Sequence, residues 1–239
     1  MSSSEVPMDT MNIPTLDGDM DAWLFYSGKG PRPGIVMIPE INGVNASLRE
    51  IASRFAAQGF IVAALDIFWR LQRRADLGYD DEDMRTARSL HDRFDYETGV
   101  SDMQAAITCL RRHPACNGKV GVVGFCLGGT MGYLAGARTD ADAAVGYYGT
   151  RLGMFLEDAP YIDRPTILHL GRLDHRTPPD LMKEIEKAVS GNPNVEVFAY
   201  ENVLHAFANH HRPSNYNAEI TRTADAHTFK LFKENLASA

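Results

Sequence analysis

Short apolar segments rich in β-branched residues alternate with segments of helical periodicity along most of the chain. Each apolar segment is too short to form a typical helix. Alternation of this kind is typical of an α/β protein in which a mostly parallel sheet is covered by helices on both faces. Strands are therefore expected at residues 34–38, 60–64, 120–123, 143–147, 166–170 and 195–200.

Two of the intervening segments carry signals for the start and end of a helix. In the first, apolar residues recur at i, i+3, i+4 and i+7 from Leu48, with Asn45 placed to cap the start and Gly59 placed to end it. The second is expected to begin with Thr177 as its N-cap and Pro178 at the first helical position. Both segments predict a strand-helix-strand unit.

Two further segments lie outside this alternation. Asp17-Gly18 is a strong turn dipeptide and predicts a hairpin that adds an antiparallel edge to the sheet. Residues 69–93 are highly charged with a weak apolar pattern, which fits either a solvated helix or a loop beside a site. We find no repeat or interdomain linker, so residues 1–239 are expected to form one α/β domain.

Composition and charge narrow the function classes. The 239 residues carry a formal net charge of −7 without a dense basic cluster, which argues against a nucleic-acid partner. No apolar run approaches the roughly 18 residues needed to span a membrane, and the first residues do not resemble a leader, so a cytoplasmic protein is expected. The 3 cysteines, Cys109, Cys116 and Cys126, have no metal-finger spacing and suggest reduced thiols.

Cys126 stands at a glycine-rich corner between a predicted strand and a predicted helix. The pattern G-x-C-x-G-G over residues 124–129 is that of a nucleophile elbow with cysteine in place of serine. A helix N-terminus favours the thiolate, and the backbone N–H of Leu127 would face an oxyanion forming on an attacked carbonyl. The simpler alternative is a small buried cysteine that packs between helix and sheet.

A nucleophile elbow needs an acid and a base later in the chain, in that order. Asp174 follows the strand expected at 166–170, and His205 follows the strand expected at 195–200. In open α/β sheets, sites form outside the carboxyl ends of the strands, so both side chains can converge on Cys126. His205 would accept the thiol proton and Asp174 would fix its tautomer. Taken singly, Asp174 also fits a turn residue and His205 a surface histidine.

The other histidines give weaker signals. His169 alternates inside a strand and is expected to be a core residue, while His175 competes with His205 for the role of base. His210 and His211 suggest a metal site together with His205, but no acidic or thiol ligand completes a recognisable set. We therefore expect no metal.

Five segments of the sequence together resemble the dienelactone hydrolase (carboxymethylenebutenolidase) family. The similarity runs over nearly the whole chain, from the expected hairpin to the last helix. The segments are Pro39-Glu40-Ile41-Asn42-Gly43-Val44-Asn45, Gly124-Phe125-Cys126-Leu127-Gly128-Gly129, Val145-Gly146-Tyr147-Tyr148-Gly149, Gly171-Arg172-Leu173-Asp174-His175 and His205-Ala206-Phe207-Ala208.

This resemblance implies an α/β-hydrolase fold with a triad of Cys126, Asp174 and His205. It also implies that Glu40 lies near the thiol and helps to control its ionisation, and that the N–H groups of Ile41 and Leu127 form the oxyanion hole. The implied physics is consistent, because a carboxylate that points at a thiol can accept its proton and leave a thiolate in a dry site.

The substrate pocket departs from the family pattern. Family members hold the substrate carboxylate with two arginines, one of them four residues after the catalytic histidine, where this chain has Asn209. Counting back from Phe94 places Met84 at the other position, and a shift of one residue places Arg85 there, with Arg88 close by. Losing a bidentate arginine weakens selection for a carboxylate. Phe68, Trp69 and Tyr147 are also expected to line the pocket, and ordinary packing in the core is the alternative for them.

The sequence thus predicts a hydrolase that opens an ester or lactone through a cysteinyl thioester, with a carboxylated enol-lactone as one candidate substrate. It is expected to need no metal or organic cofactor, to have no nucleic-acid or membrane partner, and to be a monomer or homodimer. Two alternatives stay open. One is a general carboxylesterase or thioesterase, and the other is a non-catalytic α/β protein whose Cys126 senses redox state or contacts a ligand.

Overall fold

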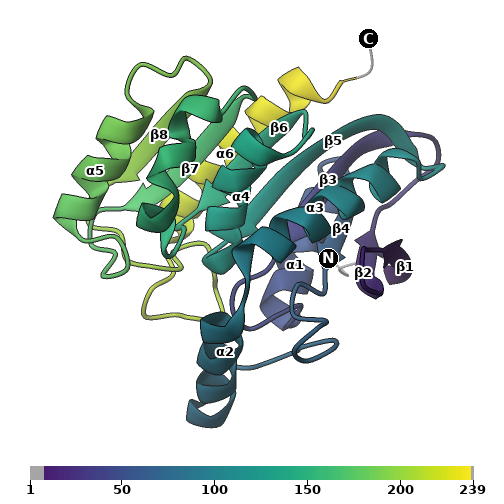
Figure 1. Ribbon diagram of the computed structural model, residues 1–239, viewed down its shortest axis with the longest axis horizontal. Helices are drawn as coiled ribbons and strands as arrows, with labels where there is room; N and C mark the ends of the chain where they lie inside the picture. The colour runs from purple at the N-terminus through teal and green to yellow at the C-terminus, as the bar shows by residue number, and fades with distance from the viewer. Residues whose placement is uncertain (1–7, 238–239) are drawn as a thin grey trace.

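The computed structural model describes residues 8–237, and its centre is an eight-stranded sheet with the order β1-β2-β4-β3-β5-β6-β7-β8 (Figure 1). β1 pairs with β2 and β2 with β4 in antiparallel fashion, and the remaining pairs are parallel. The strands are β1 (Met8–Pro14), β2 (Asp19–Phe25), β3 (Arg32–Ile38), β4 (Ile61–Leu65), β5 (Cys116–Phe125), β6 (Ala143–Tyr147), β7 (Thr166–Gly171) and β8 (Val195–Tyr200). All six strands predicted from apolar runs are confirmed, and β5 is longer than expected at both ends.

Helices cover both faces of the sheet. In Figure 1, α3, α4 and α5 lie in front of the sheet, and α1 and α6 lie behind it. This arrangement confirms the predicted α/β architecture and follows from right-handed crossovers between parallel strands. The helices are α1 (Ala46–Ala57), α2 (Asp81–Arg93), α3 (Tyr96–Arg111), α4 (Leu127–Arg138), α5 (Pro179–Val189) and α6 (Ala218–Asn235), with a kinked 3₁₀ segment η1 (Leu152–Tyr161) before β7.

The helix boundaries follow the capping signals with one shift. Asn45 caps α1 by accepting a hydrogen bond from the N–H of Leu48, as predicted. The expected start of α5 at Thr177 and Pro178 is wrong by one residue, because the helix begins at Pro179 and Pro178 takes the N-cap position. Consecutive prolines allow either register, since neither has an N–H to place inside the helix.

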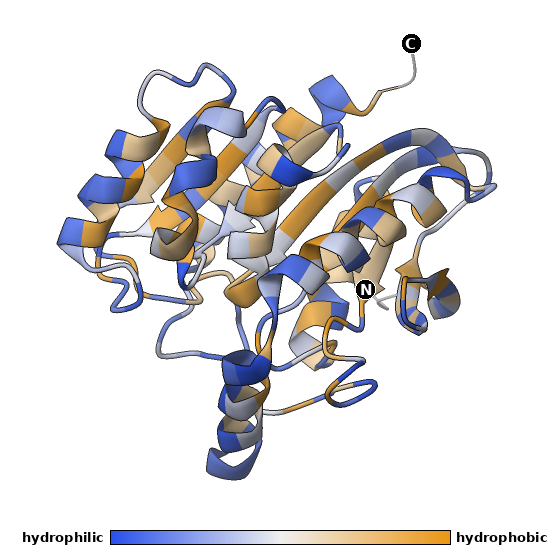
Figure 2. Ribbon diagram, viewed as in Figure 1, coloured by the Kyte–Doolittle hydropathy of each residue, from blue (hydrophilic) through white to orange (hydrophobic). Residues whose placement is uncertain are grey.

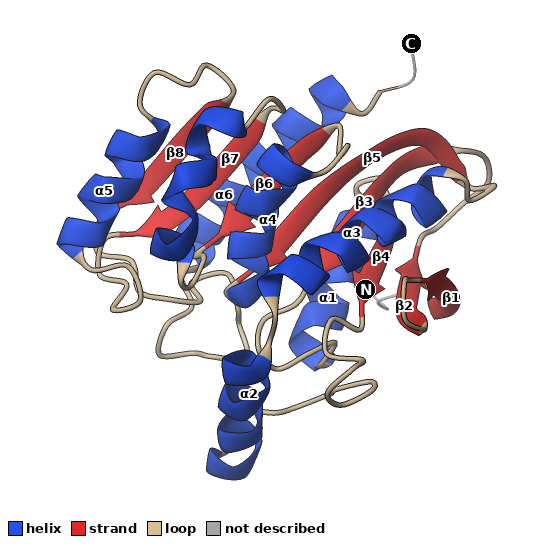
Figure 3. Ribbon diagram, viewed as in Figure 1, coloured by secondary structure: helices blue, strands red, loops and turns tan. Residues whose placement is uncertain are grey.

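The hairpin and the charged segment are also resolved. The loop at Asp17-Gly18 joins β1 to β2 at the edge of the sheet, which confirms the predicted antiparallel hairpin. Within residues 69–93, the first part forms turns and the second part forms α2, which projects from the sheet edge at which the parallel strands end (Figure 3). α2 is mostly hydrophilic (Figure 2), and buries only Ala87 and Leu90.

The parallel strands at the centre of the sheet are buried on both faces, which is why they read as apolar runs and not as alternating patterns. Their carboxyl ends all meet at one edge. The loops after β3, β5, β7 and β8 leave the sheet at that edge, and these are the loops that carry the predicted functional residues.

Candidate active site

Cys126 lies at the turn between β5 and α4 in a backbone conformation that non-glycine residues rarely adopt. Its φ is 58° and its ψ is −112°, a strained geometry of the kind that costs roughly 1–3 kcal/mol and concentrates at functional sites. The turn is held by the Cys126 N–H, which donates to the carbonyl of Tyr147 at 3.1 Å, and by the Cys126 carbonyl, which accepts from Thr150 N at 3.1 Å. The thiol therefore projects from the strand end in a fixed direction.

The predicted partners converge on this thiol. Nε2 of His205 lies 3.4 Å from Sγ of Cys126, and Nδ1 of His205 lies 2.7 Å from Oδ2 of Asp174. All three side chains are buried, with Cys126 only 7% exposed. Asp174 also accepts a hydrogen bond from the N–H of Arg176 at 2.7 Å, which fixes the carboxylate against the imidazole. This chain of contacts differs from the surroundings of a merely packed cysteine.

The electrostatics of His205 favour its charged form. Burial lowers the pKa of His205, but interaction with Cys126 in its thiolate form and the hydrogen bond to Asp174 outweigh burial and raise the pKa to about 10. The neighbouring His175 is exposed, with its ring 6.0 Å from that of His205, so it does not take the position of the base. His169 is confirmed as a core residue, because its two ring nitrogens contact Tyr200 and Thr228.

Two backbone N–H groups are available beside the thiol. Leu127 is the first residue of α4, and Ile41 lies in the turn after β3. Neither of their N–H groups has a hydrogen-bond acceptor among residues 8–237. The N–H of Gly128 donates to the carbonyl of Pro39 at 3.2 Å and ties the two turns together. This is the pairing expected of an oxyanion hole.

Glu40 follows β3 and is 7% exposed. Its Oε1 accepts a hydrogen bond from the Tyr148 hydroxyl at 3.2 Å, and its Oε2 accepts one from Nδ2 of Asn209 at 2.9 Å. Among residues 8–237, Glu40 makes no ion pair and no hydrogen bond to Cys126. The carboxylate is thus near the site but is bound by neutral donors.

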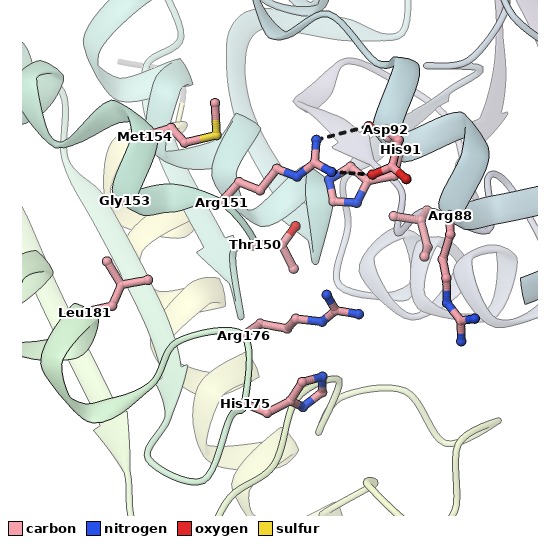
Figure 4. A pocket seen from close by; sticks show the side chains of 11 residues that line it. Arg88, His91, Asp92, Thr150, Arg151, Gly153, Met154, His175, Arg176 and Leu181 are labelled. Atoms are coloured by element: carbon pink, nitrogen blue, oxygen red, sulfur yellow. Dashed lines mark hydrogen bonds and ion pairs between the residues drawn. The ribbon is translucent and has the colours of Figure 1, made fainter. Parts of the chain in front are cut away.

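A cavity of about 570 Å³ opens beside these residues and is strongly basic (Figure 4). Ile41 and His175 form the part of its wall that adjoins the oxyanion turn and the triad. Its charged lining residues are Arg88 from α2, Arg151 before η1, Arg176 after β7 and one acid, Asp92. Figure 4 shows Arg151 beside Asp92 and Arg176 extended between the two walls.

The arginines of the cavity differ in their pairing. Nη2 of Arg151 lies 2.5 Å from Oδ1 of Asp92. Arg88 and Arg176 have no carboxylate partner within residues 8–237. His91 adds no charge at neutral pH, because burial and the nearby Arg151 lower its pKa to about 4. Two unpaired guanidinium groups in a protein of net charge −7 make the cavity a local site for anions.

The model of the dienelactone hydrolase family matches residues 20–236 of the chain. The chain belongs to the dienelactone hydrolase family. It is 39% identical over 200 residues to carboxymethylenebutenolidase of Pseudomonas putida, covering 83% of this chain and 85% of the relative. It is 33% identical over 215 residues to carboxymethylenebutenolidase 1 of Cupriavidus pinatubonensis, covering 90% and 91%.

The structure of a dienelactone hydrolase from Anabaena variabilis superposes with a TM-score of 0.70 at 18% identity, covering 98% of this chain and 100% of the other. The family and the sheet order agree on an α/β-hydrolase fold. This dienelactone hydrolase family member is therefore a hydrolase. Within residues 8–237, no helix is both long and apolar enough to cross a membrane.

Several residues expected in the pocket of this family member lie elsewhere. Tyr147 is wholly buried in the core, where its hydroxyl contacts Asp225 at 3.0 Å and Thr228 at 2.7 Å. It therefore faces α6 and not the cavity. Arg85 is exposed on α2 and is not among the residues that line the cavity, so its role as a substrate ligand stays a prediction.

Phe68 and Trp69 are also packing residues. Phe68 stacks edge-on with Phe94, with ring centroids 5.8 Å apart. Trp69 donates from Nε1 to Oδ2 of Asp102 at 2.9 Å and packs beneath Gly18 of the hairpin. Neither residue lines the cavity. An aromatic side chain fits the wall of a pocket and a packed core equally well, so the sequence of this segment did not distinguish the two.

Asn209 contacts Glu40 and does not line the cavity. The sequence analysis named Arg88 only as a neighbour of the second arginine position and did not single out Arg151, Arg176 or Tyr148 for the site. The signal for Arg88 was present, since it lies one helical turn after Arg85, but the face of α2 that meets the cavity depends on tertiary packing.

A group of three exposed side chains joins Glu50 of α1 to His210 and His211, which lie in the loop before α6. Nε2 of His210 lies 2.6 Å from Oε2 of Glu50, and Nε2 of His211 lies 3.2 Å from Oε1 of the same carboxylate. These residues have the donor types of a metal site, and the acidic member that sequence did not supply is Glu50. His205 lies in the triad and is not part of the group.

Proposed function

We propose that this protein hydrolyses an ester or lactone through an acyl group carried on the sulfur of Cys126. The observation that supports it most directly is the continuous contact from Sγ of Cys126 through the His205 ring to Asp174, at 3.4 Å and 2.7 Å. A thiol, a base and an orienting acid in this arrangement are the parts needed for nucleophilic catalysis.

The reaction follows from these parts. The thiolate of Cys126 attacks the substrate carbonyl, and the new oxyanion accepts hydrogen bonds from the N–H groups of Ile41 and Leu127. Collapse of this intermediate breaks the ester C–O bond, and the His205 imidazolium gives its proton to the departing oxygen. In a lactone that oxygen stays on the acyl chain. Neutral His205 then takes a proton from water, which attacks the thioester and releases the carboxylic acid and Cys126.

The proposed substrate carries an anionic group. Arg88 and Arg176 line the cavity and have no carboxylate partner in the described part of the chain, so a substrate carboxylate is the natural counter-ion. The name of the curated relatives, carboxymethylenebutenolidase, describes a lactone that carries a carboxylate, which agrees with such a substrate. A carboxylated enol-lactone has both the ring ester and the charge.

Trapping of the acyl group tests the reaction. With an activated ester, intact-mass measurement early in turnover is expected to give one acyl adduct that maps to Cys126, followed by stoichiometric release of acid. Cys126→Ala is expected to abolish both the adduct and turnover, whereas Cys109→Ala and Cys116→Ala serve as matched thiol controls and retain both. Full activity of Cys126→Ala would refute the proposal, and a reactive thiol without acid release would favour a redox sensor.

A further inference from the structure

The Glu40 carboxylate is buried beside the triad, and no Lys, Arg or His among residues 8–237 forms an ion pair with it. Among residues 8–237, its hydrogen-bond donors are the Tyr148 hydroxyl and the Asn209 amide, one to each oxygen. A buried charge is costly unless hydrogen bonds replace its hydration. The hydrogen bonds from these two donors therefore replace the hydration that the Glu40 carboxylate loses on burial.

Asn209 is fixed in the orientation that holds Glu40. It is 1% exposed, and its Oδ1 accepts from the N–H of His211 at 3.0 Å and from the Ser47 hydroxyl at 2.8 Å. A backbone N–H can only donate, so the oxygen must face His211 and the amide nitrogen must face Glu40. Nδ2 also donates to the Tyr79 hydroxyl at 2.7 Å. Turning this side chain would break four hydrogen bonds.

Tyr148 is equally constrained. It is fully buried with a positive φ of 40°, and its ring meets the His205 ring edge-on at 5.2 Å. Burial and the charge of Glu40 raise the pKa of Tyr148 well above its usual value. Its hydroxyl therefore keeps its proton and remains a donor to Glu40 over the whole working pH range.

The thiol has a different partner. Among residues 8–237, the hydrogen-bond partner of Sγ in Cys126 is Nε2 of His205. We propose that Asn209 is a positioning residue which, with Tyr148, holds the Glu40 carboxylate out of contact with Cys126, so that the thiol proton passes to His205. The enzyme then rests as a thiolate–imidazolium pair before substrate arrives. This inference rests on the proposed function only in assigning Cys126 as the nucleophile.

The proton balance of this step needs no further reactant. The S–H bond of Cys126 breaks, the proton forms an N–H bond at Nε2 of His205, and the Nδ1–H of the resulting imidazolium is held by Asp174. Glu40 accepts no proton in the step and stays a hydrogen-bonded carboxylate.

Thiolate formation can be measured without any substrate. The two readouts are the absorbance of the thiolate near 240 nm and the rate of alkylation of Cys126 by iodoacetamide as a function of pH, in a background with Cys109 and Cys116 replaced by alanine. Glu40→Gln is expected to keep the thiolate signal at neutral pH, since His205 holds the proton. Loss of the signal in Glu40→Gln would overturn the proposal, because it would make Glu40 the proton acceptor.

Asn209→Ala provides the opposite test. It frees Oε2 of Glu40 to accept a hydrogen bond from the thiol, which stabilises the protonated form. The alkylation profile is expected to move to higher pH by about one unit, which is roughly a tenfold slower reaction on its acidic side. Adding Glu40→Gln to Asn209→Ala is expected to restore the original profile. An unchanged profile in Asn209→Ala would contradict a positioning role.

Matched variants separate positioning from folding. Asn42→Ala removes another buried asparagine, whose Nδ2 donates to the carbonyl of Gly78 at 2.6 Å and does not contact Glu40. It is expected to leave the alkylation profile unchanged. Should Asn209→Ala fail to fold, Tyr148→Phe removes a single hydroxyl from the other oxygen of Glu40 and is expected to shift the profile in the same direction. No shift in Tyr148→Phe would then count against the proposal.

Discussion

A Cβ atom placed on Gly124 would lie 1.8 Å from the carbonyl oxygen of Gly128. β5 and α4 therefore approach each other more closely than any side chain at position 124 allows. Gly128 in turn lies against β3, since a Cβ there would be 2.3 Å from the carbonyl oxygen of Ile38. This close packing forces the chain through the tight turn whose apex is Cys126. It therefore determines both the backbone path of the turn and the direction of the thiol.

Gly124→Ala is accordingly expected to destabilise the protein by about 4 kcal/mol or more, because the clash is with backbone that cannot move aside. Gly118→Ala is the matched control. Gly118 has a φ of 89° but no atom near its Cβ position, so alanine there adds only backbone strain of roughly 1–2 kcal/mol. Thermal unfolding followed by circular dichroism compares the two, and equal losses would show that the close approach is not the cause.

Much of this corner could be predicted from the sequence. The order of Cys126, Asp174 and His205, each just after an apolar run, was enough to place them together, because parallel strands end at the same edge of a sheet. The fold followed from the same runs. These predictions depend on local pattern and chain order, which the sequence contains.

Side-chain direction could not be predicted in the same way. Tyr147 and Tyr148 are adjacent, and the sequence prediction put the first in the pocket. In the structure, Tyr147 faces the core and Tyr148 faces Glu40, because β6 ends between them and Tyr148 has a positive φ. The sequence also could not predict which face of α2 meets the cavity. Arg85 and Arg88 are about one helical turn apart, and only the tertiary packing determines which of them lines the cavity.

The activity is expected to fall at high pH as His205 loses its proton. The pKa of His205 is raised to about 10, and the proposed mechanism needs its imidazolium form to protonate the leaving oxygen. The rate constant kcat/KM for an alkyl ester should therefore decline along an alkaline limb near pH 10. Asp174→Asn removes a cause of the raised pKa, so its limb should lie at lower pH. Identical limbs would contradict this account.

The same pKa makes a prediction about stability. Unfolded His205 releases its proton near pH 6.5, whereas the folded protein holds it up to about pH 10. In the proposed ion pair the folded state holds one proton on His205 and none on Cys126, and between about pH 6.5 and 8.5 the unfolded chain holds one proton on Cys126, so the two states bind equal numbers of protons. Above about pH 8.5 the unfolded thiol also loses its proton, and the free energy of unfolding should fall as pH rises from about 8.5 to 10. Urea unfolding at several pH values, compared with His205→Gln, isolates this contribution. A variant with the same pH slope as the wild type would show that His205 is not its source.

Tyr147→Phe is expected to affect stability and not substrate binding. The variant removes a hydroxyl that contacts Asp225 and Thr228 and leaves both buried groups with one partner fewer. Such a loss costs about 1–3 kcal/mol. Chemical denaturation should detect it, while KM for the substrate stays unchanged. A raised KM with unaltered stability would return Tyr147 to the pocket.

The three arginines on and near α2 allow the charge of the substrate to be tested with an internal control. Arg88 and Arg176 line the cavity and have no carboxylate partner within residues 8–237, whereas Arg85 lies on α2 outside the cavity. For paired esters or lactones with and without a carboxylate, Arg88→Ala and Arg176→Ala should each lower kcat/KM for the charged member about tenfold, as expected for one lost charge-assisted hydrogen bond.

Arg85→Ala should stay within about twofold of the wild type on both substrates, because surface charges outside the cavity are screened by solvent. The preference should also weaken with added salt, because both cavity arginines, Arg88 and Arg176, are exposed to solvent. Equal turnover of charged and uncharged substrates by the wild type would point instead to a general carboxylesterase or thioesterase. A loss confined to Arg85→Ala would place the carboxylate on the other side of α2, where the sequence prediction put it.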